Sequence, residues 1–321
     1  MGTRFEPVRI GVVGLGGFGA LHARTLEGLA EAELVGVVDP RPDRLEPWAR
    51  VRSWNRIEQA LTESDAEAWV VATSTGSHVP VAGMILEAGR AVLVEKPLAA
   101  TRREAESLKP LVRADSSNLM VGHILLFNSE VARLRDEVQQ RGPIRFINSV
   151  RHRPITTLDA YPGESPLTLL LVHDLYVALA LVRGREPLSF ACRAGRTDRG
   201  VDLIVAELRW SDDCLGSFTA SFLTPEGMAP DGFDRLEVFG DGWAARIDPN
   251  PRPLQVWDDR ARWPMALEIR AGSGAPSGML AEELRCFCRV VRGREAVPSG
   301  ASYDDALRIL AWIDHLAREG R

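Results

Sequence analysis

A glycine-rich turn near the start of the chain constrains the fold more than any other feature. Residues 14–19 read Gly-Leu-Gly-Gly-Phe-Gly, after a short apolar run and before a helical pattern. Gly14 permits a tight turn, Gly16 lets the backbone approach a pyrophosphate, and Gly19 lets the helix pack close to the strand. Backbone amides at the helix N-terminus then face the phosphates. Such turns are common, so the motif needs a second residue to support it.

An acidic residue follows the turn at the place expected for a ribose contact. Asp39 comes 20 residues after Gly19, directly after the next apolar run. A carboxylate there binds the hydroxyls of adenosine ribose and repels a 2′-phosphate. We therefore predict NAD as cofactor, without excluding NADP, because Arg41 and Arg44 lie just beyond. The alternative is a plain turn followed by an acid at a strand end. The predicted cofactor-binding residues here are Gly14, Gly16, Gly17, Phe18, Gly19, Asp39 and Arg41.

Short apolar runs alternate with helical patterns over the first third of the chain. This alternation predicts βα units and a parallel sheet, and the continuous apolarity of the runs predicts that both sheet faces are covered. The predicted strands are Val8–Val13, Leu34–Val38, Trp69–Ala72, Ala91–Val94 and Leu119–Val121. The predicted helices are Ala20–Leu29, Ser77–Glu87 and Arg102–Arg113.

After Phe127 the pattern changes to strand-like segments that follow one another without helices, which predicts a largely antiparallel sheet. These strands are Ile144–His152, Leu188–Ala194, Asp202–Trp210, Gly216–Phe222 and Arg235–Gly240. The predicted helices are Glu130–Gln140, Leu169–Val182, Leu280–Val291 and Tyr303–Arg318, and the predicted loops are Pro225–Gly232 and Ala271–Gly278. The 321 residues suggest about two domains. We predict an α/β chain with an NAD(P)-binding Rossmann domain at 1–125 and a substrate-binding and oligomerisation α+β domain at 126–321.

Composition argues against several classes of protein. The net charge is −5 and no long Lys/Arg block occurs, which speaks against a nucleic-acid or membrane-surface partner. No uncharged apolar run reaches the ~18 residues of a membrane span, and we expect no signal peptide. The cysteines show neither CxxC nor metal-ligand spacing, so we predict no metal and a reducing, cytoplasmic setting. They are Cys192, Cys214, Cys286 and Cys288.

The chain has two lysines, Lys96 and Lys109. Lys96 stands between Glu95 and Pro97, directly after the predicted strand Ala91–Val94. Ligands of open α/β sheets bind at the carboxyl ends of the strands. A lysine that cofactor and substrate partly desolvate there can donate or accept a proton. The alternative is a solvated lysine after a strand, and its location favours the functional interpretation.

The chain resembles the Gfo/Idh/MocA oxidoreductases, the family of glucose-fructose oxidoreductase and inositol dehydrogenase. The resemblance implies a Rossmann domain followed by a mixed α/β domain whose open sheet often forms dimers, so we expect a homodimer or homotetramer. It also implies hydride transfer between a nicotinamide and a secondary alcohol of a sugar, polyol or sugar derivative. The similar segments are GVVGLGGFGALHARTL, Asp39, VVATSTGSHVPVAGMILEAGRAVLVEKPLAAT, LMVGH, VHDLY, LEVFGDGWAARID and LAEELRCFCRVVRGR.

The resemblance also assigns roles in the first domain. Lys96 matches the lysine that contacts the substrate hydroxyl, and Glu95 matches the acid beside it. Thr73, Ser74 and His78 match a loop near the cofactor, although Ser74 replaces the usual proline. His78 is equally explained as a residue at the start of a helix without a ligand.

In the second domain the resemblance singles out His173, which lies with Asp174 in a helix that is otherwise apolar. The family's histidine lies near the nicotinamide and shares proton transfer with the lysine, so the predicted catalytic residues are Lys96 and His173. Without the resemblance, a core histidine bonded to a carbonyl is the better explanation. Asp174 and Tyr176 are predicted to contact substrate.

Three departures from the family pattern remove residues that usually support the proton relay. The family commonly has an acid four residues before the histidine, and here that residue is Leu169. Tyr176 replaces an acid, and Leu125 and Leu126 precede Phe127 where an arginine is often found. Two alternative functions therefore stay open: an NAD-using glycosidase of the same fold, and a nicotinamide-binding regulatory protein with a decayed site.

The segment before this helix offers further donors to a substrate. Arg153 and Tyr161 are predicted to bind substrate hydroxyls or a carboxylate. Arg151 shares a strand face with Arg153, and a solvated strand face is the alternative explanation for both arginines.

Overall fold

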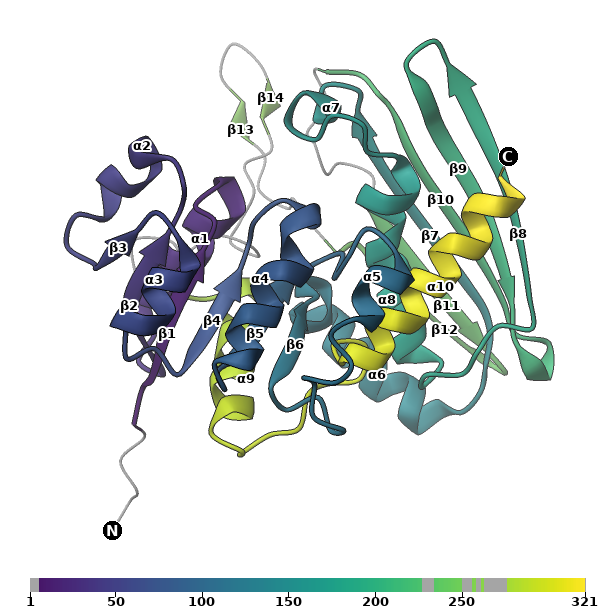
Figure 1. Ribbon diagram of the computed structural model, residues 1–321. Coiled ribbons are helices and arrows are strands. Elements are labelled where there is room, and N and C mark those ends of the chain that lie inside the picture. Colours follow the sequence, from purple (N-terminus) through teal and green to yellow (C-terminus); the bar gives the residue numbers. More distant parts are fainter. Residues whose placement is uncertain (1–5, 227–233, 250–255, 258–260, 263–275, 321) are drawn as a thin grey trace. The chain divides into compact units, whose positions relative to one another are not determined.

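The chain forms two compact units (Figure 1). The computed structural model describes residues 6–226, 234–249, 256–257, 261–262 and 276–320. The first unit comprises Met1–Phe127 and Ile269–Leu310, and the second comprises Asn128–Glu268 and Ala311–Arg321. The first unit thus takes in a late segment that the predicted boundary at residue 125 left to the second domain. This segment contains α9 (Met279–Val291), which packs against α1 (Gly17–Gly28) and η2 (Ile124–Phe127).

The first unit is built on a six-stranded sheet in which every strand pair is parallel. The strand order is β3-β2-β1-β4-β5-β6, the order of a dinucleotide-binding Rossmann sheet. The central strands are buried on both faces, as their continuous apolar sequences predicted. The parallel sheet is therefore confirmed. Its strands are β1 Val8–Val13, β2 Ala32–Val38, β3 Ser53–Trp54, β4 Ala68–Val71, β5 Ala91–Glu95 and β6 Leu119–Gly122.

One helix of the first unit is much shorter than predicted. The pattern predicted a helix over Arg102–Arg113, and α5 spans Arg102–Glu106. Pro110 has no N–H to donate and disfavours helical geometry in the residue before it, so the chain continues in separate turns. The other helices of this unit are α2 Pro42–Leu45, η1 Glu46–Trp48, α3 Ile57–Glu63 and α4 Thr75–Glu87. Helix α10, Tyr303–Glu319, belongs partly to each unit.

The second unit contains a six-stranded sheet of order β12-β11-β7-β10-β9-β8. Only β7 and β10 pair in parallel, so the largely antiparallel sheet is confirmed. The prediction missed β12, which forms a hairpin with β11 through Asp241-Gly242, a turn dipeptide that the sequence displays. The strands are β7 Ile144–Pro154, β8 Ser189–Thr197, β9 Gly200–Arg209, β10 Leu215–Thr224, β11 Arg235–Gly240 and β12 Trp243–Ile247.

The remaining elements of the second unit are mostly helical. A separate two-stranded ribbon pairs β13 (Val256–Trp257) with β14 (Ala261–Arg262). The two predicted Gly/Pro-rich loops fall mainly outside the described residues. None of the helices in the described ranges is both long and apolar enough to cross a bilayer. The helices are α6 Ser129–Arg141, α7 Thr157–Ala160, η3 Leu167–Leu171, α8 Val172–Leu181 and η4 Ser211–Asp213.

Candidate functional site

The turn after β1 lies against the end of β4, where the order of the sheet reverses. Gly14 has a φ of +86°, and a Cβ there would lie 2.7 Å from the carbonyl oxygen of Ala72. A Cβ on Gly19 would lie 1.8 Å from the carbonyl oxygen of Gly14. Both positions therefore require glycine, for the two reasons that the sequence predicted. Ligands of open α/β sheets bind at this kind of switch point.

The first turn of α1 suits a pyrophosphate. Gly16 is the N-cap, no side chain caps the helix, and no acid lies in its first turn. The first backbone N–H groups of a helix have no acceptor within the helix. A Cβ on Gly17 would meet nothing within 4 Å, so space lies outside the turn. The residues present therefore fit a dinucleotide, which would place its phosphates on these amides.

Asp39 is buried at the end of β2, where it holds the turn in place. Its Oδ2 accepts a hydrogen bond of 2.7 Å from the Leu15 N–H, and its Oδ1 accepts one of 3.0 Å from the Arg41 N–H. Arg44 Nη1 lies 3.7 Å from Oδ2. Each carboxylate oxygen has a second lone pair, so Asp39 can hold the turn and still accept from a ribose hydroxyl. The predicted ribose contact thus has a second, structural task beside it.

Lys96 follows β5 at the carboxyl edge of the same sheet, and its neighbours are firmly held. The backbone N–H of Lys96 donates a hydrogen bond of 3.2 Å to Glu95 Oε2. The ring nitrogens of His78 lie 2.8 Å from the Pro97 carbonyl oxygen and 3.2 Å from that of Thr73. Burial lowers the pKa of His78, so its neutral ring has one N–H, which we assign to the nearer carbonyl, Pro97. His78 therefore ties the first turn of α4 to the segment of Lys96.

Other predicted residues of the first unit lie at the ends of helices. Ser74 is the N-cap of α4, and its hydroxyl lies 3.5 Å from that of Ser77. Phe18 contacts the ring of His22 edge to face, with 5.2 Å between centroids. His22 was missed by the sequence analysis, although it stands three residues after Gly19 on a helix whose buried face the pattern defines. Its Nε2 lies 2.7 Å from Glu95 Oε1.

In the second unit, His173 lies in the first turn of α8, directly after the π-helical segment η3. Single π turns are frequent at functional sites, and no sequence pattern indicated this one. His173 is half-buried, and Tyr176 is fully buried on the same helix. Leu169 lies within the π turn. Lys96 and His173 belong to different units.

Two arginines and two aspartates form a buried network beside α8. Arg151 Nε and Nη2 donate to the two oxygens of Asp174 at 2.9 and 3.1 Å, and its Nη1 donates to Asp234 at 2.7 Å. Arg153 Nη1 and Nη2 donate to Asp234 at 2.6 and 2.9 Å. The solvated strand face considered for these arginines is therefore wrong, because both point into the network. Tyr161 is half exposed at the end of α7.

Comparisons with known proteins point to one family. The Gfo/Idh/MocA family, described as an oxidoreductase family with an NAD-binding Rossmann fold, matches residues 8–123. An inositol 2-dehydrogenase of Rhizobium meliloti is 27% identical over 345 residues, covering 97% of this chain and 96% of that protein. A UDP-N-acetylglucosamine 3-dehydrogenase of Acidithiobacillus ferrooxidans is 29% identical over 257 residues, covering 78% and 77%.

A solved structure has the same fold. The crystal structure of scyllo-inositol dehydrogenase from Lactobacillus casei, with bound NAD(H) and scyllo-inositol, has a TM-score of 0.83 to this chain. The two are 18% identical, and the match covers 98% of this chain and 97% of the other.

Proposed function

Because the chain belongs to the Gfo/Idh/MocA family of NAD-binding oxidoreductases, we propose that it oxidises a secondary alcohol of a cyclic polyol, a sugar or a sugar derivative. Two of its relatives are named for inositol and for UDP-N-acetylglucosamine, and both compounds carry such alcohols on a ring. The observation that carries the proposal is the place of Lys96. Lys96 follows β5 at the carboxyl edge of the sheet. In the sheet order β5 lies two strands from β1, and the glycine turn after β1 fits the dinucleotide.

In the proposed reaction the alcohol loses a proton and a hydride and becomes a ketone. A bound NAD would supply the acceptor for the hydride of the carbinol carbon. Lys96 accepts the hydroxyl proton, so its amine has to be neutral when it does so. His173 is proposed to share this proton. Glu95 and His78 keep the backbone on either side of Lys96 in place.

The test is NADH formation with myo-inositol, scyllo-inositol and UDP-N-acetylglucosamine. Lys96→Met keeps the stem of the side chain and removes the amine, and we expect turnover to fall by about 100-fold or more. Stabilisation by NAD in a thermal-shift assay should persist. Lys109→Met is the matched control, because Lys109 is the other lysine of the chain and is exposed. Full activity in Lys96→Met would refute the role of the amine.

Leu169 motivates a second candidate, a nicotinamide-binding protein without turnover, since the usual acid before His173 is absent. It predicts stabilisation by NAD and no NADH with any polyol. The NAD-using glycosidase differs from both, because it releases sugar from a glycoside while NADH absorbance stays flat. The same cofactor and substrate series, extended by aryl glycosides, separates the three functions.

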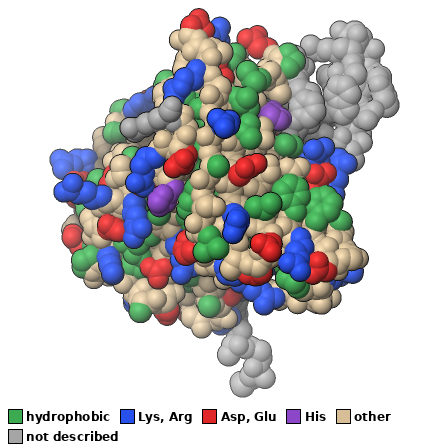
Figure 2. Space-filling model, turned by 90° about the vertical axis from the view of Figure 1, so that its right-hand side faces the viewer, with side chains coloured by type: hydrophobic (Ala, Val, Ile, Leu, Met, Phe, Trp, Pro, Cys, Tyr) green, Lys and Arg blue, Asp and Glu red, His purple; other side chains and the backbone are tan. Residues whose placement is uncertain are grey.

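We further propose that the chain forms a homodimer or homotetramer through the sheet of the second unit. Three apolar residues lie in register across the adjacent strands β10, β7 and β11: Leu215, Phe146 and Phe239. The two phenyl rings stack with 5.9 Å between their centroids, and Leu215 and Phe239 are exposed. Figure 2 views the side on which β8, β9 and β10 are drawn in Figure 1, where apolar side chains lie among charged ones.

Light scattering after size exclusion tests this assembly. Phe239→Asp should convert the oligomer to a monomer, because a charge would have to be buried in the interface. Leu188→Asp places the same charge at another exposed apolar residue of this unit and should leave the mass unchanged. A monomeric wild type would overturn the proposal. The four cysteines are free and buried, which suits the cytoplasmic location that we propose.

A further inference from the structure

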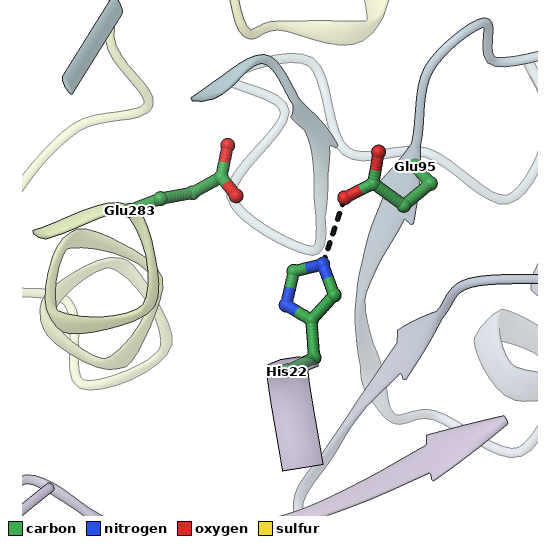
Figure 3. Close-up of side chains that lie close together, drawn as sticks. All are labelled: His22, Glu95 and Glu283. Atoms are coloured by element: carbon green, nitrogen blue, oxygen red, sulfur yellow. Dashed lines mark hydrogen bonds and ion pairs between the residues drawn. The ribbon is translucent and has the colours of Figure 1, made fainter. Parts of the chain in front are cut away.

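Three ionisable side chains of the first unit meet in its interior (Figure 3). His22 comes from α1, Glu95 from the end of β5 and Glu283 from α9. His22 and Glu283 are completely buried, and Glu95 is 9% exposed. One nitrogen or oxygen atom of each side chain lies within 4.8 Å of those of the other two. We call these residues the interior triad.

Two members of the interior triad form a pair. His22 Nε2 lies 2.7 Å from Glu95 Oε1, and Glu95 Oε2 accepts from the Lys96 N–H. We assign the proton of this hydrogen bond to Nε2, so that Glu95 accepts with both carboxylate oxygens. A Cβ on Gly122 would lie 3.0 Å from Glu95 Oε1, so the neighbouring strand leaves this carboxylate little room to move.

Glu283 points toward this pair (Figure 3), and no salt bridge of its carboxylate is found within the described part of the chain. Neither of its carboxylate oxygens has a hydrogen-bond partner among the described residues. Apart from the buried imidazole of His123, the charged groups on and around α9 in the described ranges are engaged elsewhere or exposed. Arg285 pairs with Glu31 and Glu282, Arg289 with Glu295, Arg292 with Glu67, Cys286 contacts Glu295, Arg24 and Glu27 of α1 are exposed, and His123 is buried just before η2.

An ionised Glu283 would therefore be a buried carboxylate beside a second carboxylate. Isolated buried charges are so costly that such groups take up a proton instead. Burial and the neighbouring Glu95 raise the pKa of Glu283 well above its usual range. The geometry and the electrostatics thus agree on a neutral acid.

We propose that Glu283 holds a proton at neutral pH and, as a neutral acid packed on the His22–Glu95 pair, acts as a positioning residue for Lys96. Glu283 would act on Lys96 through Glu95, whose Oε2 accepts a hydrogen bond from the backbone N–H of Lys96. The same pair reaches back to α1, the helix that carries the cofactor turn. The link to catalysis rests on the proposed function, whereas the proton and the position of Lys96 can be measured without any substrate.

The first experiment looks for the proton directly. Infrared difference spectra between the wild type and Glu283→Gln should show the carbonyl band of one protonated carboxylic acid, lost in the variant. Glu282→Gln is the matched control, because Glu282 is the preceding residue on α9 and half its side chain is exposed. A difference spectrum showing only an ionised carboxylate would overturn the proposal, as would a metal ion bound stoichiometrically to the wild type and lost in Glu283→Gln.

The second experiment measures the proton through stability. The folded chain holds it at pH values where the unfolded chain has released it, so this contribution is complete below the unfolded pKa and is lost as the pH rises toward the folded pKa. Between pH 5 and 8, unfolding of the wild type should release about one proton more than unfolding of Glu283→Gln. Equal proton release in the two proteins would contradict a neutral Glu283.

The third experiment follows Lys96 itself. Reductive methylation with ¹³C-formaldehyde labels two lysines and the α-amine, and Lys96→Arg assigns the signals. Glu283→Gln should leave the Lys96 signal in place, whereas Glu283→Leu or His22→Gln should shift it and its titration midpoint, with Lys109 unchanged. If the Lys96 signal is the same in all variants, the positioning role is refuted, even where no polyol is turned over.

Discussion

Asp174→Asn tests whether the carboxylate next to His173 serves the fold or the substrate. In the structure Asp174 takes two hydrogen bonds from Arg151, and neither side chain exposes more than 5% of its surface. The network of two arginines and two aspartates is neutral as a whole. The substitution keeps the shape of the side chain and leaves one buried positive charge in excess.

The expected cost is large because the pair is buried. Removing one partner of a buried ion pair costs about 3–5 kcal/mol of unfolding free energy. Arg151 keeps its bond to Asp234, so we expect a value near the lower end, about 3 kcal/mol. For a domain of this size that corresponds to a fall in Tm of roughly 6–12 °C.

Differential scanning calorimetry measures this fall, and an exposed pair supplies the control. Arg145 and Asp241 form two hydrogen bonds of 3.0 and 2.9 Å with the same geometry, but both side chains are largely exposed. Asp241→Asn should leave Tm unchanged within error, because solvent screens such pairs. If Asp174→Asn keeps the wild-type Tm and instead raises KM for a polyol, Asp174 contacts substrate and our structural explanation is wrong.

Two further predictions concern the first unit. Gly19→Ala should weaken NAD binding on the order of tenfold or more, because its Cβ would lie 1.8 Å from the Gly14 carbonyl oxygen. Gly83→Ala is the control, because the nearest atom to its Cβ would be 3.7 Å away, and it should bind NAD normally in the same titration. The Arg292 guanidinium lowers the pKa of Glu67 to about 2, so this pair stabilises the fold above pH ~4.5 and the effect is lost as the pH falls toward 2. Glu67→Gln, which mimics the protonated carboxyl, should therefore be less stable than the wild type at pH 7 and approach it near pH 2, measured by urea unfolding.

The first unit could be predicted largely from its sequence because its signals are local. The glycine turn and Asp39 lie within one βα unit, and each glycine has a steric reason that the motif states. The errors were also local in origin. The helix predicted to reach Arg113 stops early because Pro110 interrupts it, and the two-residue strand β3 was too short for its pattern to be recognised.

The second unit was harder because its decisive contacts join distant residues. Arg151 and Asp234 form a hydrogen bond although 83 positions separate them in the sequence, and no local pattern around either residue indicates its partner. The sequence therefore led us to predict substrate contacts for Asp174 and Arg153. In the structure Asp174 accepts from Arg151 and Arg153 donates to Asp234. The interior triad was missed for the same reason, since Glu283 comes from a late helix that returns to the first unit.

The polar groups around Lys96 argue against a decayed site. Burying His78, Glu95 and Glu283 costs free energy that apolar side chains would not cost. Local rules of this kind are usually broken where function requires it. A protein that only binds nicotinamide needs the glycine turn and Asp39, whereas it gains nothing from burying His78 and Glu95 against the segment of Lys96 at the sheet edge. Lys96→Met is therefore the variant on which the enzymatic interpretation depends most directly.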